Sequence, residues 1–561
     1  MANIAGLLES QLVEPERVLY RQFIEGAWRD ISAREIAAYA ARWQAFLRAE
    51  GFARGDRIAL CLKNGIHWVA ADLAALGLGA VVVPLYADDN PENVVWCLQN
   101  SGARLLVAEN SRMVAALTRS HEELARTDPS VAKAPRMLSL VADAGVSNTV
   151  DAALPRKAGP FEVVRLEDDA LATLCYTSGT AGRPKGVMLT HGNILANVAG
   201  CERLGIARRD DLFLSLLPLS HMFERTGGYY LPLLLGAKVA YVRSVSLLVE
   251  DLASERPTVM FAVPRVFEKF AARVNEALAK SPLKKRLFDL VVAAGSRAAR
   301  GDAGFLDKIT LALLRNRVAG PVLGRLGGRM RLAVLGGAPL DPSIAWLFVG
   351  LGLPVLQGYG MTEASPVISV NRPENNVPES VGAPLDNVEV KVAGNGELLA
   401  RGPSIMKGYW NNPEANAKSL AGGWLHTGDL AEIRDGRIFI RGRLKDVLVL
   451  SNGEKLPPQD VELAILGDQT FEQAILIGEG RPFLTLVAVT RETDEKSLIQ
   501  RANERLKEFP RYIRVRRIVA TREPWTVDNG LLTPTLKVRR ERVQKAFGAE
   551  IERAYAGGAP D

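Results

Sequence analysis

The residues best suited to hold a negatively charged group lie together in a short stretch, residues 176–186, which reads Tyr-Thr-Ser-Gly-Thr-Ala-Gly-Arg-Pro-Lys-Gly. Glycines let backbone N–H groups approach a polyanion, and hydroxyls and a lysine add donors and a positive charge. The stretch is not a Walker A loop, because Pro184 stands where the second glycine is required and Gly186 where Ser or Thr is required. It predicts an anion-binding loop of another type; the alternative is a flexible surface turn. Its candidate ligands are Thr177, Ser178, Gly179, Thr180, Gly182 and Lys185.

A second group of such residues occupies positions 357–363, Gln-Gly-Tyr-Gly-Met-Thr-Glu, and is preceded by Gly-Gly-Ala-Pro at 336–339. The ring of Tyr359, between two glycines, can lie against a purine. The carboxylate of Glu363 can hold Mg²⁺, which takes one or two protein carboxylates beside substrate phosphates. The alternative is a tight turn that caps a core strand. The candidates in this group are Gly337, Ala338, Gly358, Tyr359, Gly360, Met361, Thr362 and Glu363.

Three further segments carry polar groups in glycine-rich or turn-forming surroundings. Asp429, in Trp-Leu-His-Thr-Gly-Asp-Leu (424–430), can accept both hydroxyls of a ribose, although by itself it fits an ordinary Asx turn better. Residues 441–455 contain Arg-Gly-Arg-Leu-Lys-Asp followed by Ser-Asn-Gly-Glu-Lys. Lys537 lies in Leu-Thr-Pro-Thr-Leu-Lys near the end of the chain, where a lone lysine is usually a solvated charge.

The composition limits the class of protein. At 561 residues with 48% hydrophobic and 24% charged residues, the chain is expected to fold as two or more globular domains. The net charge of +7 is too small for nucleic acid as the main partner. Part of the excess lies at residues 501–545, a basic region that is either a solvated face or a landing surface for phosphates or an anionic membrane.

The cellular location follows from the cysteines and the N-terminus. The four cysteines form no Cys-x-x-Cys pair, and residues 1–11 lack a basic start before an apolar run. Neither a disulfide framework, a structural zinc site nor a signal peptide is therefore expected, which favours the cytoplasm. Residues 68–86 are almost wholly apolar, but Asp72 and three Gly or Pro breaks favour a buried helix followed by a buried strand over a membrane span.

Apolar, β-branched runs alternate with helical patterns over most of the chain. Strands are expected at 56–62, 103–108, 238–242, 259–263, 331–335, 388–392 and 397–401, and a helix at 91–100. This alternation predicts an α/β fold with a largely parallel sheet. Residues 264–330 predict a long, basic helical hairpin, residues from about 377 a small antiparallel β subdomain, and the last 115 residues or so a compact α+β domain.

Taken in order and spacing, these five segments resemble the adenylate-forming (AMP-binding) superfamily, over residues 34–540. The resemblance is strongest to the long-chain fatty acyl-CoA synthetases, at residues 217–225, 263–269 and 532–537. It implies a large N-terminal domain of parallel α/β sheets with a small β subdomain (1–442), a hinge (443–446), and a small, mobile α+β C-terminal domain (447–561). It also implies ATP-dependent activation of a fatty acid to acyl-AMP, then transfer to CoA, with Mg²⁺ as the metal.

The resemblance also assigns roles to residues. The 177–185 loop wraps the β- and γ-phosphates, Gly337, Ala338 and Tyr359 frame adenine, and Thr362 contacts the α-phosphate. Glu363 holds Mg²⁺, Asp429 and Arg443 bind ribose, and Lys537 reaches the carboxylate and α-phosphate. Lys445 is the hinge residue, and Ser451, Asn452 and Gly453 approach the thiol channel. His221 is a gate between acyl pocket and nucleotide, unless it only packs at a strand end. Ala181 departs from the pattern, since relatives carry a hydroxyl there, and removes one phosphate contact.

Other functions remain open at this point. An aryl or medium-chain acid, or acyl carrier protein as acceptor, fits the same residues. A nucleotide-binding protein without catalysis is disfavoured because Lys537 and Glu363 are both present. A fatty acid substrate and the basic 501–545 region suggest peripheral membrane contact, whereas neither acyl chain length nor oligomeric state is predicted.

Overall fold

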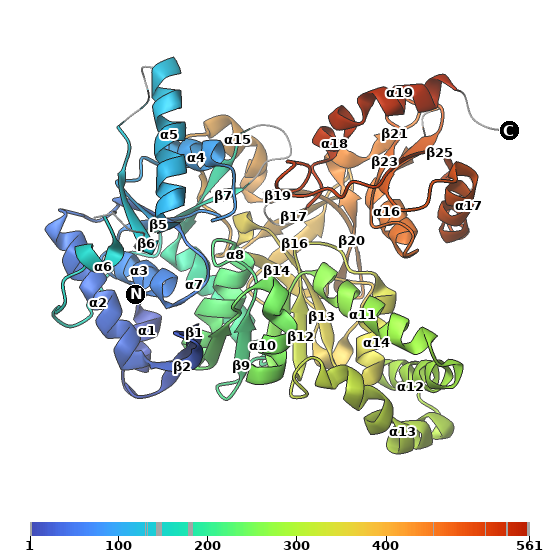
Figure 1. Cartoon of the computed structure of the whole chain (residues 1–561), viewed down its shortest axis with the longest axis horizontal. Coiled ribbons are helices and arrows are strands. Elements are labelled where there is room, and N and C mark those ends of the chain that lie inside the picture. The colour runs from blue at the N-terminus through green and yellow to red at the C-terminus, as the bar shows by residue number, and fades with distance from the viewer. Residues whose placement is uncertain are drawn as a thin grey trace. The chain divides into compact units, whose positions relative to one another are not determined.

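The computed structural model describes residues 3–128, 131, 133–141, 148–177, 183–452, 454–510, 512–533 and 537–557. The chain divides into two compact units, whose elements are labelled in Figure 1. The first unit comprises Met1–Thr177, Pro184–Val390 and Ala400–Leu425. The second comprises Ser178–Arg183, Lys391–Leu399 and His426–Asp561. The 443–446 hinge and the domain limits around it stay a prediction.

One sheet of the first unit has seven strands. They are, in sheet order, β18 (Gly408–Tyr409), β8 (Lys185–Thr190), β7 (Leu171–Thr177), β4 (Val81–Pro84), β3 (Arg57–Cys61), β5 (Leu105–Asn110) and β6 (Arg136–Val141). The strands from β7 to β6 are parallel, and β8 pairs antiparallel with both of its neighbours. All four residues of β4 are buried, as expected for a β-branched run in a sheet that is covered on both faces.

The second sheet of this unit has nine strands. They are β15 (Ala383–Pro384), β14 (Val367–Val370), β13 (Val355–Gly360), β12 (Leu332–Leu335), β11 (Val259–Ala262), β9 (Leu212–Ser215), β10 (Lys238–Tyr241), β1 (Val18–Ile24) and β2 (Ala27–Ser32). The strands from β13 to β1 are parallel, and antiparallel strands close both edges. Parallel sheets with antiparallel edges confirm the predicted α/β class.

Helices connect these strands and supply most of the remaining core. They are α1 (Gly6–Gln11), α2 (Ala33–Ala49), α3 (Ile66–Gly77), α4 (Pro91–Ser101), α5 (Ser111–Thr127), α6 (Val150–Ala153), α7 (His191–Glu202), α8 (Met222–Glu224), α9 (Leu231–Leu235), α10 (Leu248–Glu255), α14 (Pro342–Leu351) and α15 (Pro413–Ser419). The helix expected at 91–100 is confirmed as α4, which begins with a proline and ends at Gly102 in the left-handed conformation. Capping boxes fix the starts of α2 and α7, at Ser32 and Thr190.

Residues 68–86 form the predicted buried helix and strand. Helix α3 spans 12 residues and β4 follows it, and Asp72 is completely buried. Among the residues that the structure describes, no helix is both long and apolar enough to cross a bilayer.

Residues 264–330 form three helices rather than the expected hairpin of two. These are α11 (Pro264–Ala279), α12 (Pro282–Arg300) and α13 (Phe305–Gly324). Pro282 separates α11 from α12, because the residue before a proline, here Ser281, rarely adopts the helical conformation. Gly301 ends α12 with a positive φ of 85°. Helices α12 and α13 pack on one another and on α14.

Three small sheets contribute to the second unit. A four-stranded sheet, part of which belongs to this unit, has the order β16 (Glu389–Val392), β17 (Glu397–Arg401), β19 (Leu425–Arg434) and β20 (Arg437–Arg443). The C-terminal part contains the pair β21 (Leu448–Val449) and β22 (Lys455–Leu456), the three-stranded sheet β23 (Gln473–Ile477), β24 (Leu484–Val489) and β25 (Val515–Thr521), and the helices α16 (Pro458–Leu466), α17 (Glu495–Arg505), α18 (Arg540–Ala546) and α19 (Gly548–Ala556). It has its own hydrophobic core, as the predicted α+β domain requires.

Candidate functional site

The stretch predicted to bind an anion connects two paired strands. Thr177 ends β7 and Lys185 begins β8, and the two residues are partners across this antiparallel hairpin. The structure therefore brings the two ends of the predicted loop together at the carboxyl end of β7. The residues between them that were predicted as ligands, Ser178, Gly179, Thr180 and Gly182, lie outside the described residues, as does Ala181.

The second predicted group lies at the carboxyl edge of the nine-stranded sheet. Strands β12 and β13 are adjacent and parallel, with Leu335 opposite Gln357. Gly337 and Ala338, which follow β12, and Tyr359, near the end of β13, therefore emerge at the same edge. Ligands of open α/β sheets bind at this edge. Gly337 has a φ of 82°, a conformation that glycine adopts without strain.

Packing limits the residue types around Tyr359. Gly358 and Gly360 both lie in β13, which pairs antiparallel with β14. A Cβ at Gly360 would lie 2.0 Å from the carbonyl oxygen of Pro366, so no larger residue fits there. Met361 continues the chain, half-buried, into the turn that carries Glu363. This glycine is thus required by the backbone around it, whatever ligand the site takes.

The predicted metal-binding carboxylate is held by a tyrosine. Glu363 lies in a short 3₁₀ turn, Thr362–Ala364, and is 8% exposed. Its Oε1 accepts a hydrogen bond of 2.8 Å from the hydroxyl of Tyr409. Burial and the adjacent Glu363 carboxylate raise the pKa of Tyr409, so its hydroxyl keeps the proton that it donates.

Tyr409 also connects Glu363 to the predicted anion loop. Strand β18 pairs with β8, with Tyr409 opposite Val187. The ammonium group of Lys185 lies over the Tyr409 ring, 5.2 Å from its centroid, in a cation–π contact. We refer to Lys185, Tyr409 and Glu363 as the Lys185–Tyr409–Glu363 cluster. It places a cation, a ring and a carboxylate together, a combination suited to a metal-bound phosphate chain.

The predicted ribose ligands are paired in the second unit. Asp429 and Arg443 are opposite each other in the β19–β20 hairpin, with Arg443 Nε 3.2 Å from Asp429 Oδ1. The backbone N–H of Asp429 donates to Thr427 Oγ1 at 3.1 Å, and that of Gly428 donates to Glu397 Oε1 at 2.9 Å. These two hydrogen bonds hold the turn before Asp429 in place, and the ion pair with Arg443 orients the Asp429 carboxylate.

Lys537 lies in the second unit and is bonded to Thr533 through its backbone. Its backbone N–H donates to Thr533 Oγ1 at 3.0 Å, and its carbonyl accepts from the backbone N–H of Thr533 at 2.8 Å. The Lys537 side chain is exposed. The predicted hinge residue, Lys445, lies in the 3₁₀ turn Leu444–Asp446 directly after β20.

The predicted thiol-channel residues belong to the turn between β21 and β22. Ser451 and Asn452 are exposed, and the side chain of Asn452 accepts a 3.1 Å hydrogen bond from the backbone N–H of Glu454. Gly453 lies outside the described residues.

His221 has a structural role that can be seen directly. It precedes α8, and its Nδ1 accepts a 3.2 Å hydrogen bond from the backbone N–H of Phe223, as a helix cap does. The ring of Phe223 packs against Gly336, next to the predicted adenine site. His221 therefore caps the segment that approaches the nucleotide region, and its role as a gate stays a prediction.

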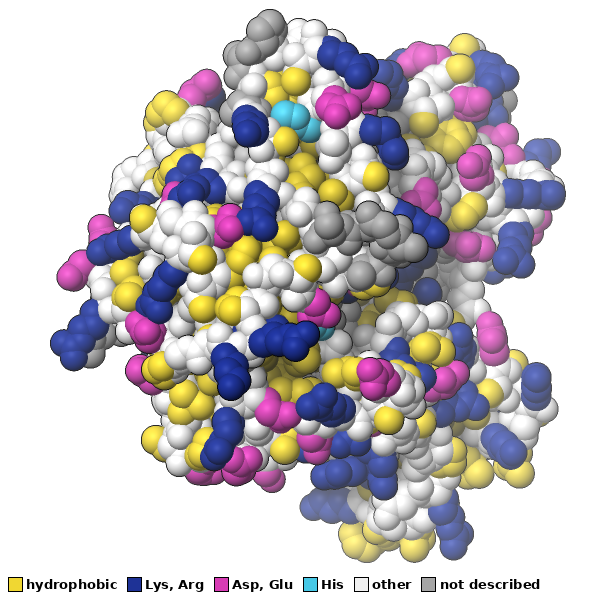
Figure 2. Space-filling model, turned by 60° about the vertical axis from the view of Figure 1, so that its left-hand side comes forward, with side chains coloured by type: hydrophobic (Ala, Val, Ile, Leu, Met, Phe, Trp, Pro, Cys, Tyr) yellow, Lys and Arg dark blue, Asp and Glu magenta, His cyan; other side chains and the backbone are white. Residues whose placement is uncertain are grey.

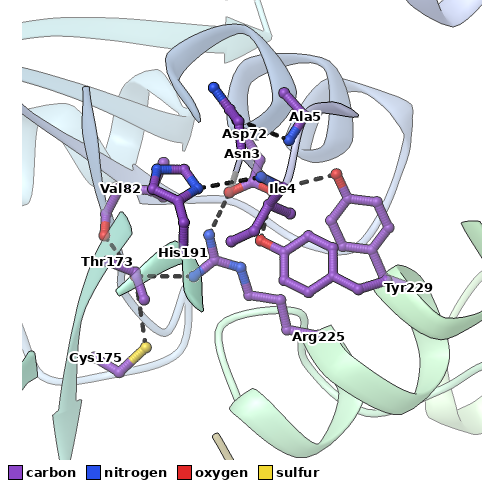
Figure 3. Close-up of polar contacts among 11 residues, drawn as sticks. Asn3, Ile4, Ala5, Asp72, Val82, Thr173, Cys175, His191, Arg225 and Tyr229 are labelled. Carbon is purple, nitrogen blue, oxygen red and sulfur yellow. Dashed lines mark hydrogen bonds and ion pairs between the residues drawn. The ribbon is translucent and has the colours of Figure 1, made fainter. Parts of the chain in front are cut away.

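The segment that follows His221 contains one partner of a buried ion pair (Figure 3). Arg225 begins the π-helical turn η1 (Arg225–Tyr230), is completely buried, and pairs with the buried carboxylate of Asp72. It also donates to Thr173 Oγ1 at 2.9 Å, while the hydroxyls of Tyr229 and Tyr230 donate to Asp72 Oδ2 at 3.2 and 2.9 Å. The paired charges join α3, β7 and η1.

His191 completes this polar core as a neutral ring. Burial, assisted by Arg225 and Arg54, lowers the pKa of His191 to about 3. Its Nδ1 can then accept the 3.1 Å hydrogen bond from the backbone N–H of Ile4. The η1 turn in its turn contacts the site, because the Thr226 hydroxyl donates to the carbonyl oxygen of Ser365 at 3.1 Å.

The predicted site residues thus fall into two sets. Thr177, Lys185, the 337–338 and 358–363 segments and His221 belong to the first unit, and Asp429, Arg443, Lys445 and Lys537 to the second. Sequence reasoning missed Tyr409, which links Lys185 to Glu363. Its only local signal is the pair of aromatic residues at 409–410 after a glycine.

The chain is similar to known proteins over almost its whole length. Residues 9–410 match the AMP-binding enzyme family, and residues 445–559 match the AMP-binding enzyme C-terminal domain. The chain is 31% identical to long-chain-fatty-acid–CoA ligase FadD15 of Mycobacterium bovis, over 99% of this chain and 97% of the relative. It is 30% identical to the peroxisomal long chain acyl-CoA synthetase 7 of Arabidopsis thaliana, over 90% and 79% of the two chains.

Solved structures share the fold. ATP-bound MatB from Rhodopseudomonas palustris superposes with a TM-score of 0.76 at 21% identity, over 98% of this chain and 99% of that one. Both the large α/β part and the C-terminal part are thus accounted for by a single known architecture. The chain belongs to the adenylate-forming, AMP-binding enzyme family.

Proposed function

We propose that the protein is a fatty acid–CoA ligase that forms AMP. The carboxylate oxygen of a fatty acid attacks the α-phosphorus of ATP, the bond to the β-phosphate oxygen breaks, and pyrophosphate leaves with the electron pair. The sulfur of CoA, having lost its proton, then attacks the acyl carbonyl carbon, and AMP leaves. The observation that carries this proposal is the 31% identity to a long-chain-fatty-acid–CoA ligase over nearly the full length of both chains.

The first unit supplies the groups for the triphosphate. In both half-reactions negative charge grows on phosphate or carbonyl oxygens, so preorganised cations and N–H donors lower the barrier. Lys185 is the first residue of β8, and from there its ammonium group can approach phosphate oxygens. Tyr359, at the edge of the nine-stranded sheet, can cover the purine. Thr362 can contact the α-phosphate. These roles are assigned by position and by the family.

Mg²⁺ fits the donors that are present. Tyr409 holds one oxygen of Glu363, and among the described residues no group donates to the other oxygen. Nor do the described residues contain a cluster of three or more metal-binding side chains. A single carboxylate with an available oxygen suits Mg²⁺ that is bound mainly through substrate phosphates. When bound, the ion would neutralise charge on those phosphates; Glu363 would orient it.

The second unit supplies the ribose ligands and the mobile lysine. The Asp429 carboxylate, directed by Arg443, can accept both ribose hydroxyls. Lys537 would hold the fatty acid carboxylate and the α-phosphate during adenylation. Rotation about Lys445 would then remove it and bring Ser451 and Asn452 to the thiol channel, which gives each half-reaction its own set of groups.

Product analysis across a panel of acids tests this function. The protein is given ATP, Mg²⁺ and short-chain, medium-chain, long-chain or aryl acids, with CoA or with holo acyl carrier protein as acceptor. We expect mass spectrometry to detect long-chain acyl-CoA with equimolar AMP. Acyl carrier protein as the preferred acceptor, or an aryl acid as the preferred substrate, would replace this proposal by the corresponding ligase.

The role of Lys537 is tested by separating the half-reactions. Lys537→Ala should reduce acyl-AMP formation by about 100-fold or more, since one well-placed donor contributes about 3 kcal/mol to the transition state. Thioester formation from supplied acyl-AMP should change far less. Lys496→Ala, which removes an exposed lysine from α17 in the same unit, is the control. Equal losses in both half-reactions would contradict the assigned role.

A further inference from the structure

The positive charge of the chain is concentrated in one helical region. Residues 280–329, which contain α12 and α13, carry eleven lysines and arginines and three acidic residues, a formal net charge of +8. The complete chain carries +7, so all other residues together are close to neutral. Most of these basic side chains are exposed, including Lys284, Arg286, Lys308 and Arg317. This is a local electrostatic feature rather than a general property of the surface.

The same region exposes large apolar side chains. On α13, Phe305 is 78% exposed, Leu306 76%, Ile309 40% and Leu313 67%. At 100° per residue these four positions fall within one arc of about 100° on the helix. Ala319 is the one residue of α13, in the part of the chain that the structure describes, that is buried. A helix on an ordinary protein surface turns polar residues outward, whereas this one presents an apolar stripe.

Helix α12 extends the apolar surface and fixes α13. Leu283 is 70% and Leu290 46% exposed, and they lie one heptad apart on the same side of α12. Arg297, one heptad further along, donates from Nε to Asp307 of α13 at 2.9 Å. Figure 2 shows yellow apolar and dark-blue basic side chains together at the lowest end of the molecule, the level at which α13 lies in Figure 1. Apolar and basic groups thus share one face.

We propose that the α12–α13 pair docks on a membrane surface that contains anionic lipids. Exposed Phe and Leu side chains would enter the boundary between headgroups and acyl chains, while the surrounding Lys and Arg side chains contact phosphate groups. A second copy of the chain is a poorer partner, because a twofold interface would bring two faces of net charge +8 together. A soluble polyanion would match the charge but leave the apolar stripe in water.

This inference does not depend on the proposed ligase activity, and it differs from the surface expected at residues 501–545. Vesicle binding can be present whether or not the protein adenylates an acid. Double variants distinguish the two surfaces. Phe305→Ser/Leu306→Ser removes apolar side chains from the α12–α13 pair, and Lys284→Gln/Arg286→Gln removes two positive charges from it. Arg516→Gln/Arg522→Gln removes the same number of positive charges from the C-terminal region. All six side chains are exposed, so folding should be retained.

Flotation with vesicles tests the proposal on the full-length protein. We expect at least tenfold stronger binding to vesicles of 70% phosphatidylcholine and 30% phosphatidylglycerol than to phosphatidylcholine alone, and weaker binding at 0.5 M than at 0.1 M NaCl. The Phe305→Ser/Leu306→Ser protein should bind at least tenfold more weakly, and Lys284→Gln/Arg286→Gln severalfold more weakly. The Arg516→Gln/Arg522→Gln control should bind like the unaltered protein, and all melting temperatures should agree within about 2 °C.

Four results would overturn the proposal. These are no vesicle binding by the unaltered protein, undiminished binding by the Phe305→Ser/Leu306→Ser protein, a loss in the C-terminal control as large as that in Lys284→Gln/Arg286→Gln, and equal binding to neutral vesicles. If light scattering showed a dimer that the α13 variant abolishes, with no vesicle binding, the face would instead be a contact between copies of the chain.

Discussion

Two buried carboxylates of the first unit, Asp72 and Glu363, are used in different ways. Asp72 is completely buried, and Arg225, Tyr229 and Tyr230 together contact both of its oxygens. Glu363 is nearly as buried, at 8% exposure, yet among the described residues only Tyr409 donates to it, at Oε1. The comparison teaches that burial alone does not mark a site. Glu363 differs from Asp72 in that it lies beside Lys185 and Tyr409 and keeps one oxygen without a donor among the described residues.

A third buried carboxylate, Glu224, differs from both of these. Burial raises the pKa of Glu224 to about 8, and among the described residues neither of its carboxylate oxygens has a hydrogen-bond partner. Near neutral pH it is therefore mostly protonated. Burial raises the pKa of Asp72 as well, but the positive charge of Arg225 opposes that rise. Glu224, next to that arginine in the sequence, is accommodated mainly by keeping its proton.

The largest effect should follow from breaking the Asp72–Arg225 pair. Arg225→Met leaves an unpaired buried carboxylate and should lower the free energy of unfolding by about 3–5 kcal/mol. Chemical denaturation measures this loss. The double variant Asp72→Leu/Arg225→Met removes both charges and should recover a large part of it. If Arg225→Met alone unfolds like the unaltered protein, the pair is not the structural element described above.

The next largest effect should come from Glu363→Gln, and it should appear in activity rather than in stability. Loss of the metal-binding charge should lower kcat/KM about 100-fold, or about 2.7 kcal/mol, and raise the Mg²⁺ concentration for half-maximal rate. The free energy of unfolding should change by less than about 1 kcal/mol, since Gln can still accept from Tyr409. Unchanged Mg²⁺ dependence would remove Glu363 from the metal site.

Glu224→Gln should change the pH dependence of stability. Because the folded-state pKa of about 8 lies above the ordinary value of 4.5, the folded protein binds more protons than the unfolded chain between these values. The contribution of Glu224 to the free energy of unfolding is therefore complete below pH 4.5. It is lost as the pH rises to about 8, at up to about 1.4 kcal/mol per pH unit. The Gln variant cannot titrate there, so its stability should fall less steeply from pH 5 to pH 8.

The control for this titration is Glu202→Gln, at an exposed position at the end of α7. Its pH profile of stability should match that of the unaltered protein. A Glu224→Gln profile parallel to that control would mean that Glu224 is ionised in the folded protein.

The smallest effect should be that of Tyr409→Phe. The ring over Lys185 is kept and only the hydroxyl that donates to Glu363 is lost, a change of about 1 kcal/mol. We expect a severalfold rise in the Mg²⁺ concentration for half-maximal rate and little change in thermal unfolding. An effect as large as that of Glu363→Gln would show that Tyr409 contacts the substrate itself.

Much of the fold follows from local patterns in the sequence. The strands expected at 56–62, 103–108, 238–242, 259–263 and 331–335 are confirmed as β3, β5, β10, β11 and β12, because β-branched apolar runs between helical segments have few other structures open to them. Asp429 and Arg443 could be assigned from the family, and their pairing follows from the hairpin that joins them. The break between α11 and α12 is predictable from Pro282, because a residue that precedes a proline rarely adopts the helical conformation.

The contacts that could not be predicted are long-range. Tyr409 is 46 residues from Glu363 and reaches it only because β18 pairs with β8, and β18 is a two-residue strand with no periodicity to detect. Asp72 and Arg225 are 153 residues apart and lie on α3 and η1, so no local pattern in the sequence pairs them. The exposure of the apolar stripe of α13 could not be predicted either, because periodicity shows which residues share a face but not what that face contacts.

Pyrophosphate release in the absence of CoA tests the central claim most directly. With ATP, Mg²⁺ and a long-chain fatty acid, the enzyme should release one pyrophosphate per bound acyl-AMP in a rapid burst, and no burst without the acid. If none of a wide range of acids elicits pyrophosphate release, the assignment of this chain as an acyl-adenylate-forming enzyme is wrong.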